Sequence, residues 1–101
     1  MSDLQKELED YDKTYWDFTE DAKIINVHHI VGHLNKLMGK IAEYTDTVDH
    51  GGKGDDTKMV KEVIPDLLQQ GYRLASLFGV DAEAQHKKRL DGLREGFGDK
   101  K

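Results

Sequence analysis

The chain has 101 residues, which is room for one small domain. Its 20 acidic and 15 basic residues give a formal net charge of −5, which argues against nucleic acid or an anionic membrane as the main partner. The absence of Cys excludes a disulfide framework, a thiolate zinc site and a thiol nucleophile. No apolar run exceeds three residues and the start lacks a signal-peptide pattern, so we expect a cytoplasmic protein without membrane-spanning segments.

The apolar content predicts a folded chain with a modest core. Leu, Ile, Val and Phe make up 24 of the residues, above the level of about 20% below which chains tend to be disordered. A chain of this length buries somewhat less than about 70% of its unfolded surface, so small helical proteins often gain stability by associating. We therefore expect a homo-oligomer, either a dimer or a tetramer.

A single Pro and one obvious Gly-rich loop predict an all-helical fold, similar to a four-helix bundle. The first helix is expected from Ser2 to about Asp17, with Ser2 and Gln5 at capping-box spacing. Its apolar residues recur every three or four positions: Leu4, Leu8, Tyr11 and Tyr15. The pattern loosens over residues 16–22, which predicts a joint before the next helix.

The second helix carries the strongest structural signal. Its apolar residues follow one another at intervals of three and four, apart from one longer interval that contains Tyr44. They are Ile24, Val27, Val31, Leu34, Met38, Ile41 and Val48. This pattern predicts a long packed helix. Gly32 and Gly39 lie on it, where each costs about 1 kcal/mol relative to Ala unless a neighbouring backbone needs the space. The helix is expected to end in the glycine-rich loop 49–56.

The remaining sequence predicts a third helix and a fourth. Asp55, Asp56 or Thr57 can cap the third helix, and Pro65 predicts either a kink or a fresh start with Pro in the first turn. Gly79 is expected to end this helix in a left-handed conformation, and Asp81 to cap the last helix, from Ala82 to about Glu95. Residues 96–101 are expected to form a flexible tail.

Two patterns invite a ligand but have simpler explanations. The loop segment Gly51-Gly52-Lys53-Gly54 lacks the preceding strand and the Lys-Ser/Thr ending of a P-loop, which favours a plain connection. His29 and His33 lie four residues apart on one helix face, a spacing that suits a divalent metal. Without a carboxylate in this run, ordinary surface or partly buried histidines are the favoured interpretation.

The same face continues as a basic stripe. His29, His33, Lys36 and Lys40 follow at steps of four, three and four. The stripe could receive an anion, whereas a solvated face, or a face paired with acidic residues of a neighbouring helix, is its usual role.

Glu62 and Asp66 lie one helical turn apart on one face. Such a carboxylate pair could hold Mg²⁺, which prefers oxygen ligands and keeps several waters. Acids in the first turn beside a helix N-terminus would look the same in the sequence.

The chain resembles the MazG-like, all-α nucleotide pyrophosphohydrolases, whose superfamily includes helical dUTPases and phosphoribosyl-ATP pyrophosphohydrolases. The segment from Asp66 to Asp81, DLLQQGYRLASLFGVD, is similar to the helix that begins at the family's metal-binding Asp. Upstream, HLNKLMGKIAE, from His33 to Glu43, is similar to the helix of the family's first acidic cluster. The resemblance covers residues 24–95 of a single domain, 1–101.

The resemblance implies magnesium-dependent hydrolysis of nucleoside triphosphates to monophosphate and pyrophosphate, with Glu-x-x-Glu and Glu-x-x-Asp motifs holding the metal. This chain departs from both motifs. When Gly39 is aligned with the Gly of the family motif, two positions that are acidic in the family are not acidic in this chain. They hold Lys36 or Leu37 and then Lys40. On the next helix Val63 occupies the Glu position of the motif, and only the Asp, Asp66, is retained. On the last helix Arg89 and Leu93 lie near the positions at which the family has Lys and Asn.

Two ammonium groups in place of carboxylates reverse the charge of the site and would repel a divalent cation. One hypothesis is a displaced acidic site for Mg²⁺, with Asp66, Glu62 and Glu43 as the main candidate ligands and Asp46 and Asp49 nearby. Another is a non-catalytic pocket where His33, Lys36 and Lys40 contact the phosphate of a nucleotide directly. A third is a non-catalytic helical protein-interaction module. The residues leave the enzyme assignment open and name no catalytic group.

Overall fold

The computed structural model describes residues 3–16 and 20–98, and these ranges are all-helical, as predicted. The first helix, α1, spans Asp3–Tyr15, and a 3₁₀ turn, η1, spans Glu20–Ala22. The long helix α2 spans Lys23–Asp49. Residues 17–19 of the predicted joint lie outside the described residues.

The second half of the chain begins with three helical segments that follow one another without a break. They are α3 (Asp56–Lys58), the π-helical turn η2 (Met59–Val63) and α4 (Ile64–Leu77). The last helix, α5, spans Ala82–Gly98 and so runs past the predicted end at Glu95. Over the described ranges, no helix combines the length and the apolar character that crossing a membrane requires.

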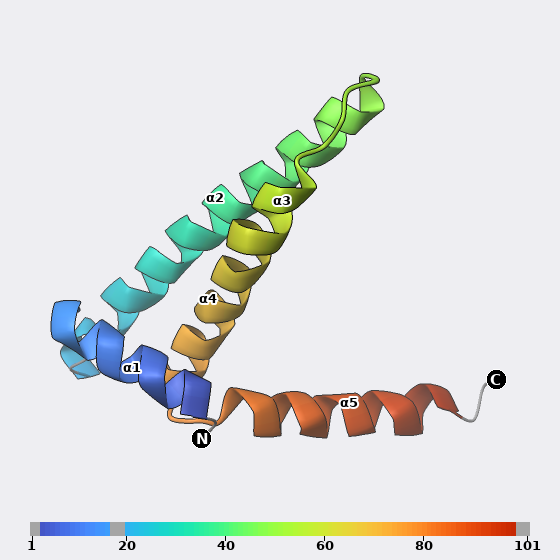
Figure 1. The fold of residues 1–101 in the computed structure, drawn as a ribbon. Coiled ribbons are helices and arrows are strands. Elements are labelled where there is room, and N and C mark those ends of the chain that lie inside the picture. Colours follow the sequence, from blue (N-terminus) through green and yellow to red (C-terminus); the bar gives the residue numbers. More distant parts are fainter. Residues whose placement is uncertain (1–2, 17–19, 99–101) are drawn as a thin grey trace.

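The helices form an open arrangement. As Figure 1 shows, α2 and α4 run antiparallel as a hairpin, α1 crosses the far end of α4, and α5 extends away from the hairpin. The radius of gyration is 16.8 Å, whereas a compact chain of about 100 residues has about 13 Å. The chain alone therefore leaves much of its helical surface uncovered.

The helix cap and the proline position expected at the start of the third helix are both present in the structure. Asp55 caps α3, since its Oδ1 accepts a hydrogen bond from the backbone N–H of Lys58 at 3.0 Å. Pro65 lies in the first turn of α4, directly after the π turn, in which the N–H of Ile64 donates to the carbonyl of Met59, five residues back. Because Pro has no N–H and its ring crowds the carbonyl four residues back, a wider turn at this point accommodates it.

The turn into α5 also agrees with the sequence. Gly79 ends α4 with φ of +70°, and Oδ1 of Asp81 accepts a hydrogen bond from the N–H of Glu83 at 3.1 Å.

The core is small and partly polar. Among the described residues, only four apolar side chains are buried: Ala22, Ile30, Leu37 and Val63. Four polar side chains are equally buried: Gln5, Asp12, Asn26 and Gln70. Buried polar groups are stable only when they are hydrogen-bonded, so the contacts of these four side chains shape the fold.

The apolar stripe predicted for α1 packs only at Leu8, which is half-buried. Leu4, Tyr11 and Tyr15 are exposed, and the side that faces α4 carries Gln5 and Asp12 instead. The reason is polar anchoring, because partners across the fold satisfy the hydrogen-bonding groups of these two side chains.

Gln5 joins α1 to the turn between α4 and α5. Its Nε2 donates to the carbonyl of Val80 at 2.9 Å and to Oγ of Ser76 at 3.2 Å, and its Oε1 accepts from the N–H of Ala82 at 2.8 Å. Gln5 therefore caps the start of α5. The other member of the predicted capping box, Ser2, lies outside the described residues.

The predicted stripe of α2 packs within the chain only along one edge, where Val27, Leu34 and Ile41 are half-buried. Ile30 and Leu37, which lie beside the stripe, are the buried apolar residues, whereas Ile24, Val31, Met38 and Val48 are exposed. Nor does a close helix approach explain the two glycines, since no heavy atom lies within 4 Å of a Cβ built at Gly32 or Gly39, apart from the chain neighbours and the helix backbone.

Candidate functional site: a basic groove between α2 and α4

Two adjoining pockets lie between α2 and the helical segment α3–α4. The inner pocket encloses about 200 Å³ and is lined by His33, Lys36, Leu37, Lys40, Asp66, Gln69, Gln70 and Arg73. The outer pocket encloses about 160 Å³ and is lined by Lys40, Glu43, Tyr44, Thr47, Lys53, Asp55, Lys58, Met59 and Val63. Because Lys40 lines both pockets, they form one continuous groove.

Helix periodicity brings the inner-pocket residues together. His33, Lys36 and Lys40 follow at steps of three and four on α2 and share one side of that helix. Asp66 and Gln70 do the same on α4. The three basic residues that the sequence analysis grouped therefore line one pocket, and the fold adds Asp66 from the facing helix.

The two lysines are the free cations of the inner pocket. Lys36 is exposed and Lys40 half-buried, and neither forms an ion pair with another described residue. The guanidinium of Arg73, in contrast, is held by the carboxylate of Asp12. Two ammonium groups opposite the single carboxylate of Asp66 leave the pocket positive within a chain of net charge −5.

Gln70 adds a polar group whose hydrogen-bonding capacity is unused. Its side chain is only 3% exposed, and its Oε1 has no hydrogen-bond partner among the described residues. An unpaired buried acceptor costs about 1–3 kcal/mol. An unsatisfied buried group of this kind in a native structure often marks strain, a catalytic role, or the place of a bound water or ion.

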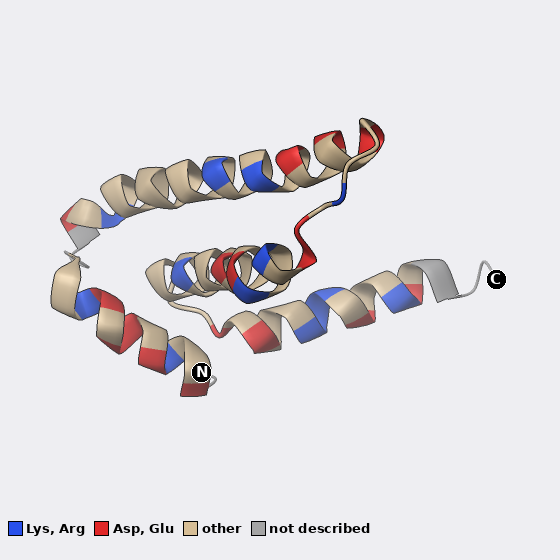
Figure 2. Ribbon diagram, turned by 45° about the horizontal axis from the view of Figure 1, so that its top comes forward, with Lys and Arg blue, Asp and Glu red and all other residues tan. Residues whose placement is uncertain are grey.

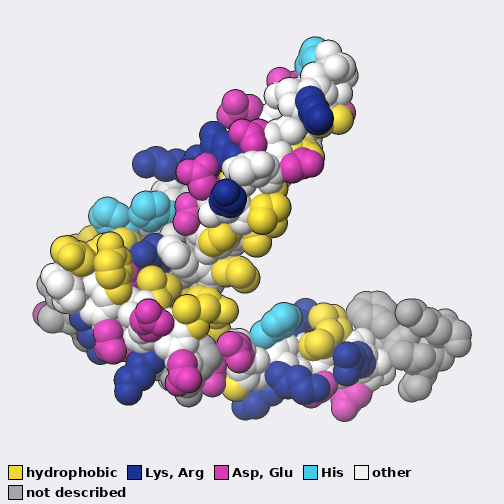
Figure 3. Space-filling model, viewed as in Figure 1, with side chains coloured by type: hydrophobic (Ala, Val, Ile, Leu, Met, Phe, Trp, Pro, Cys, Tyr) yellow, Lys and Arg dark blue, Asp and Glu magenta, His cyan; other side chains and the backbone are white. Residues whose placement is uncertain are grey.

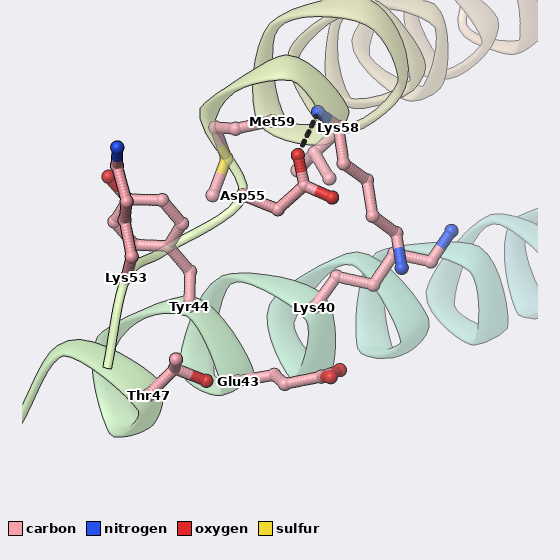
Figure 4. Close-up of a pocket in the computed structure, with 9 residues that line it drawn as sticks. Lys40, Glu43, Tyr44, Thr47, Lys53, Asp55, Lys58 and Met59 are labelled. Atoms are coloured by element: carbon pink, nitrogen blue, oxygen red, sulfur yellow. Dashed lines mark hydrogen bonds between the residues drawn. The ribbon is translucent and has the colours of Figure 1, made fainter. Parts of the chain in front are cut away.

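The outer pocket has a third and a fourth lysine at its rim. Figure 4 shows the side chains of Lys40 and Lys58 extending toward each other across the pocket, with the carboxylate of Asp55 nearby. Lys53 lies at the loop end of the same pocket. The carboxylate of Asp55 is engaged by the N–H of Lys58 as the helix cap.

Tyr44 fixes the loop over the outer pocket. Its hydroxyl donates a short hydrogen bond to Oδ1 of Asp56. This hydrogen bond to the Asp56 carboxylate, together with the carboxylate's negative charge, raises the pKa of Tyr44 above its ordinary value. Tyr44 consequently remains neutral and ties the end of α2 to the start of α3.

The three predicted magnesium ligands do not share a pocket. Asp66 lines the inner pocket, Glu43 lines the outer pocket, and Glu62 is exposed and lines neither. Over the part of the chain that the structure describes, no group of three or more Asp, Glu, His or Cys side chains is placed to hold a metal ion. As Figure 2 shows, α2 carries basic positions at its start and in its middle, and its acids lie toward the C-terminal end.

An aromatic cluster lies beside the inner pocket, where it contacts His33 and Arg73. The ring of Trp16 lies 5.4 Å from His29 and 6.4 Å from His33 between centroids, nearly parallel to His33. The guanidinium of Arg73 lies 4.9 Å from the Trp16 ring. His29 is exposed and His33 half-buried. The two histidines thus contact an aromatic ring, as partly buried surface histidines do.

Among the residues that sequence reasoning missed are Gln70 and Arg73 of the inner pocket, and Trp16, which lies beside it. Gln70 and Arg73 follow Asp66 by four and seven residues, so helix periodicity could have placed them on the same face of α4. Trp16 carried no such signal, because its position depends on how α1 crosses the hairpin. Comparison of the chain with protein-family models, with curated proteins and with solved structures found no match.

Proposed function

We propose that the chain is a divergent member of the MazG-like nucleotide pyrophosphohydrolase superfamily that binds a nucleotide or another phosphate-bearing ligand in the inner pocket. In this proposal magnesium-dependent hydrolysis of nucleoside triphosphates is weakened or lost. The observation that carries it is the arrangement of Lys36 and Lys40 opposite Asp66 and Gln70 in one pocket.

The chemistry of these side chains suits an anion with polar attachments. Ammonium groups bind phosphate oxygens as point charges and take over the neutralising role that a metal ion has in many phosphate sites. The Asp66 carboxylate and the Gln70 carbonyl are acceptors, which pair with hydroxyl or N–H donors. A nucleotide offers both kinds of group, with the donors on its sugar and base, whereas the only donors of inorganic phosphate are the protons on its own oxygens.

Loss of hydrolysis follows from the same side chains. Magnesium in a phosphate site both neutralises charge and positions the attacking water. Two lysines beside Asp66 oppose the entry of a divalent cation, so the ligand would bind without an activated nucleophile. Mg²⁺ is the expected cofactor only if hydrolysis is retained.

A second candidate function, a helical protein-interaction module, is favoured by a different feature. A groove of about 590 Å³ lies between α1 and α4 and is lined mainly by apolar side chains, among them Leu4, Tyr11 and Leu68, which are exposed. Such an apolar groove suits a helix from another protein.

Trp16 provides the readout for the ligand proposal, because it is the single Trp and its ring lies against His33 of the inner pocket. We would titrate the protein with AMP, ADP, ATP and inorganic phosphate, with and without Mg²⁺, following Trp fluorescence and the heat of binding. Pyrophosphate release would be assayed in the same samples. We expect nucleotide binding without Mg²⁺ and tighter binding of nucleotides than of phosphate.

The matched variants are Lys40→Gln and Lys61→Gln, because Lys40 lines the groove and Lys61 is exposed outside the described pockets. Lys40→Gln should weaken nucleotide binding about tenfold, equivalent to about 1.4 kcal/mol, and Lys61→Gln should leave it unchanged. Equal affinities in both variants would refute the proposed pocket. Magnesium-dependent pyrophosphate release that disappears in Asp66→Asn would refute the loss of hydrolysis.

A further inference from the structure

Two rows of side chains form the walls of the groove between α1 and α4. Each row follows helical steps of three and four residues. The rows are Leu4, Leu8 and Tyr11 on α1, and Pro65, Leu68 and Tyr72 on α4. Leu4, Tyr11 and Leu68 are 58%, 59% and 56% exposed. Exposed apolar side chains that gather along one groove mark an interaction site, whereas single exposed ones are ordinary.

Polar contacts beneath the groove hold its two walls in place. Gln5 ties α1 to the turn after α4, and Asp12 ties α1 to Arg73 of α4. Gln5 follows Leu4 and Asp12 follows Tyr11, so each buried anchor lies about 100° around the helix from an exposed apolar neighbour. A groove whose walls are fixed before binding avoids part of the ordering cost of association.

A row of acidic side chains borders the same groove on the outer side of α1. Asp3, Glu7 and Asp10 are exposed, each directly precedes a residue of the α1 wall, and Glu7 lines the groove itself. None of the three forms an ion pair with another described residue. In Figure 3, acidic side chains lie along α1 below the hydrophobic area where α1 crosses the hairpin. This rim of the groove is therefore negative.

The α4 side of the groove offers no cation to neutralise that rim. Gln69, which lines the groove on this side, is uncharged, and the guanidinium of Arg73 is already held by Asp12. The groove is thus apolar between its walls and acidic along one edge.

We infer that this groove binds an amphipathic helix of another protein, with an apolar stripe that is flanked on one side by Lys or Arg. From Leu4 to Tyr11 the α1 wall rises about 10 Å, which matches two turns of a partner helix with apolar residues at i, i+4 and i+7. The basic flank pairs with the acidic row, which sets the orientation and disfavours helices with acidic flanks. A small apolar ligand would leave the three carboxylates unused. The inference rests on the second candidate function and names the chemistry of its partner.

The test uses two synthetic helical peptides with Leu at i, i+4 and i+7 that differ only in the flank of this stripe, which carries Lys in one and Glu in the other. Binding of each labelled peptide to the full chain is followed by fluorescence anisotropy. At low salt the Lys peptide should bind at least about tenfold tighter than the Glu peptide, and high salt should reduce the difference. The triple variant Asp3→Asn, Glu7→Gln, Asp10→Asn should reduce the difference at low salt as well.

A matched pair of substitutions on α4 locates the bound peptide. Leu67 and Leu68 are neighbours and both are exposed, but of the two only Leu68 lines the groove. Leu68→Gln should weaken binding of the Lys peptide about tenfold, because the partner would bury a polar side chain in place of an apolar one. Leu67→Gln should leave the affinity unchanged. Equal effects of the two substitutions would place the peptide elsewhere and overturn the inference.

The remaining outcomes separate this inference from the function on which it rests. Equal binding of both peptides that is lost in Leu68→Gln would retain the interaction module and overturn the basic partner. Binding of neither peptide would overturn both.

A peptide of residues 82–98 tests a second copy of the chain as the occupant, because α5 carries Leu90 and Leu93 together with Lys87 and Arg94. We expect it to bind more weakly than the Lys peptide. Tighter binding would assign the groove to the chain's own last helix and overturn the inference of a different partner.

Discussion

Arg73 of α4 holds Asp12 of α1 by two hydrogen bonds: Nε donates to Oδ2 at 2.8 Å and Nη2 donates to Oδ1 at 3.1 Å. The Asp12 side chain is 1% exposed. This bidentate pair, with the guanidinium over the ring of Trp16, fixes α1 across the hairpin. The placement of α1 therefore depends on this ion pair and on the hydrogen bonds of Gln5 more than on its exposed apolar residues.

Asp12→Asn should destabilise the fold by about 3 kcal/mol, because it leaves the Arg73 guanidinium without its buried counter-charge. Urea unfolding followed by circular dichroism gives the free energy, and Trp16 fluorescence reports the local change. Asp10→Asn, at an exposed position of the same helix, is the control and should change the free energy by less than about 0.5 kcal/mol. Equal effects of the two substitutions would show that the ion pair does not anchor α1.

Gln70→Leu should affect stability and ligand binding in opposite directions. Replacing the buried amide with an apolar side chain of similar volume removes the unpaired Oε1 and should stabilise the free protein by about 1 kcal/mol. The same change removes the acceptor proposed to bind the ligand, so nucleotide affinity should fall. Thermal unfolding and fluorescence titration measure the two effects. A stabilised variant with unchanged affinity would assign Gln70 to the core alone.

Two glycine substitutions should have opposite signs. A Cβ at Gly54 would overlap the ring of Tyr44, so Gly54→Ala should destabilise the chain by about 1–2 kcal/mol. A Cβ at Gly32 meets no heavy atom beyond the chain neighbours and the helix backbone, so Gly32→Ala should stabilise α2 by up to about 1 kcal/mol. Thermal unfolding of both variants measures the two changes in stability. Destabilisation by Gly32→Ala would indicate that a partner backbone occupies that space.

The Gly54→Ala variant also has an expected effect on titration. Displacing the Tyr44 ring from Asp56 should lower the pKa of Tyr44 toward its ordinary value, which NMR of the ring can follow. In the native fold the raised pKa favours neutral Tyr44. The stabilisation from this hydrogen bond is therefore fully present below pH 10 and is lost as pH rises through the folded-state pKa.

The sequence predicted the helices better than their faces. Local chemistry was sufficient at Asp55, Gly79 and Asp81, where the capping groups act within a few residues of themselves. The packed side of α1 could not be read from its periodicity, because Gln5 and Asp12 are buried through partners more than 60 positions away. Polar anchors of this kind carry no periodic signal.

For the candidate site, the spacing of His33, Lys36 and Lys40 was enough to group them, since a single helix determines their common side. Bringing Asp66 and Gln70 opposite to them required the register of the hairpin, which a single sequence does not contain. Glu43 and Glu62 were grouped with Asp66 by type, and the fold separates them because each faces a different part of the surface.

The π turn over Met59–Val63 sets the angular relation between the two ends of the groove. It inserts one residue relative to a regular α-helix, which rotates all that precedes it by about 100° about the helix axis. Without this extra residue, Lys58 would turn away from Lys40 while Asp66 and Gln70 kept their places. A single-residue change in helix length thus determines whether the chain presents one long basic groove or two separate charged surfaces.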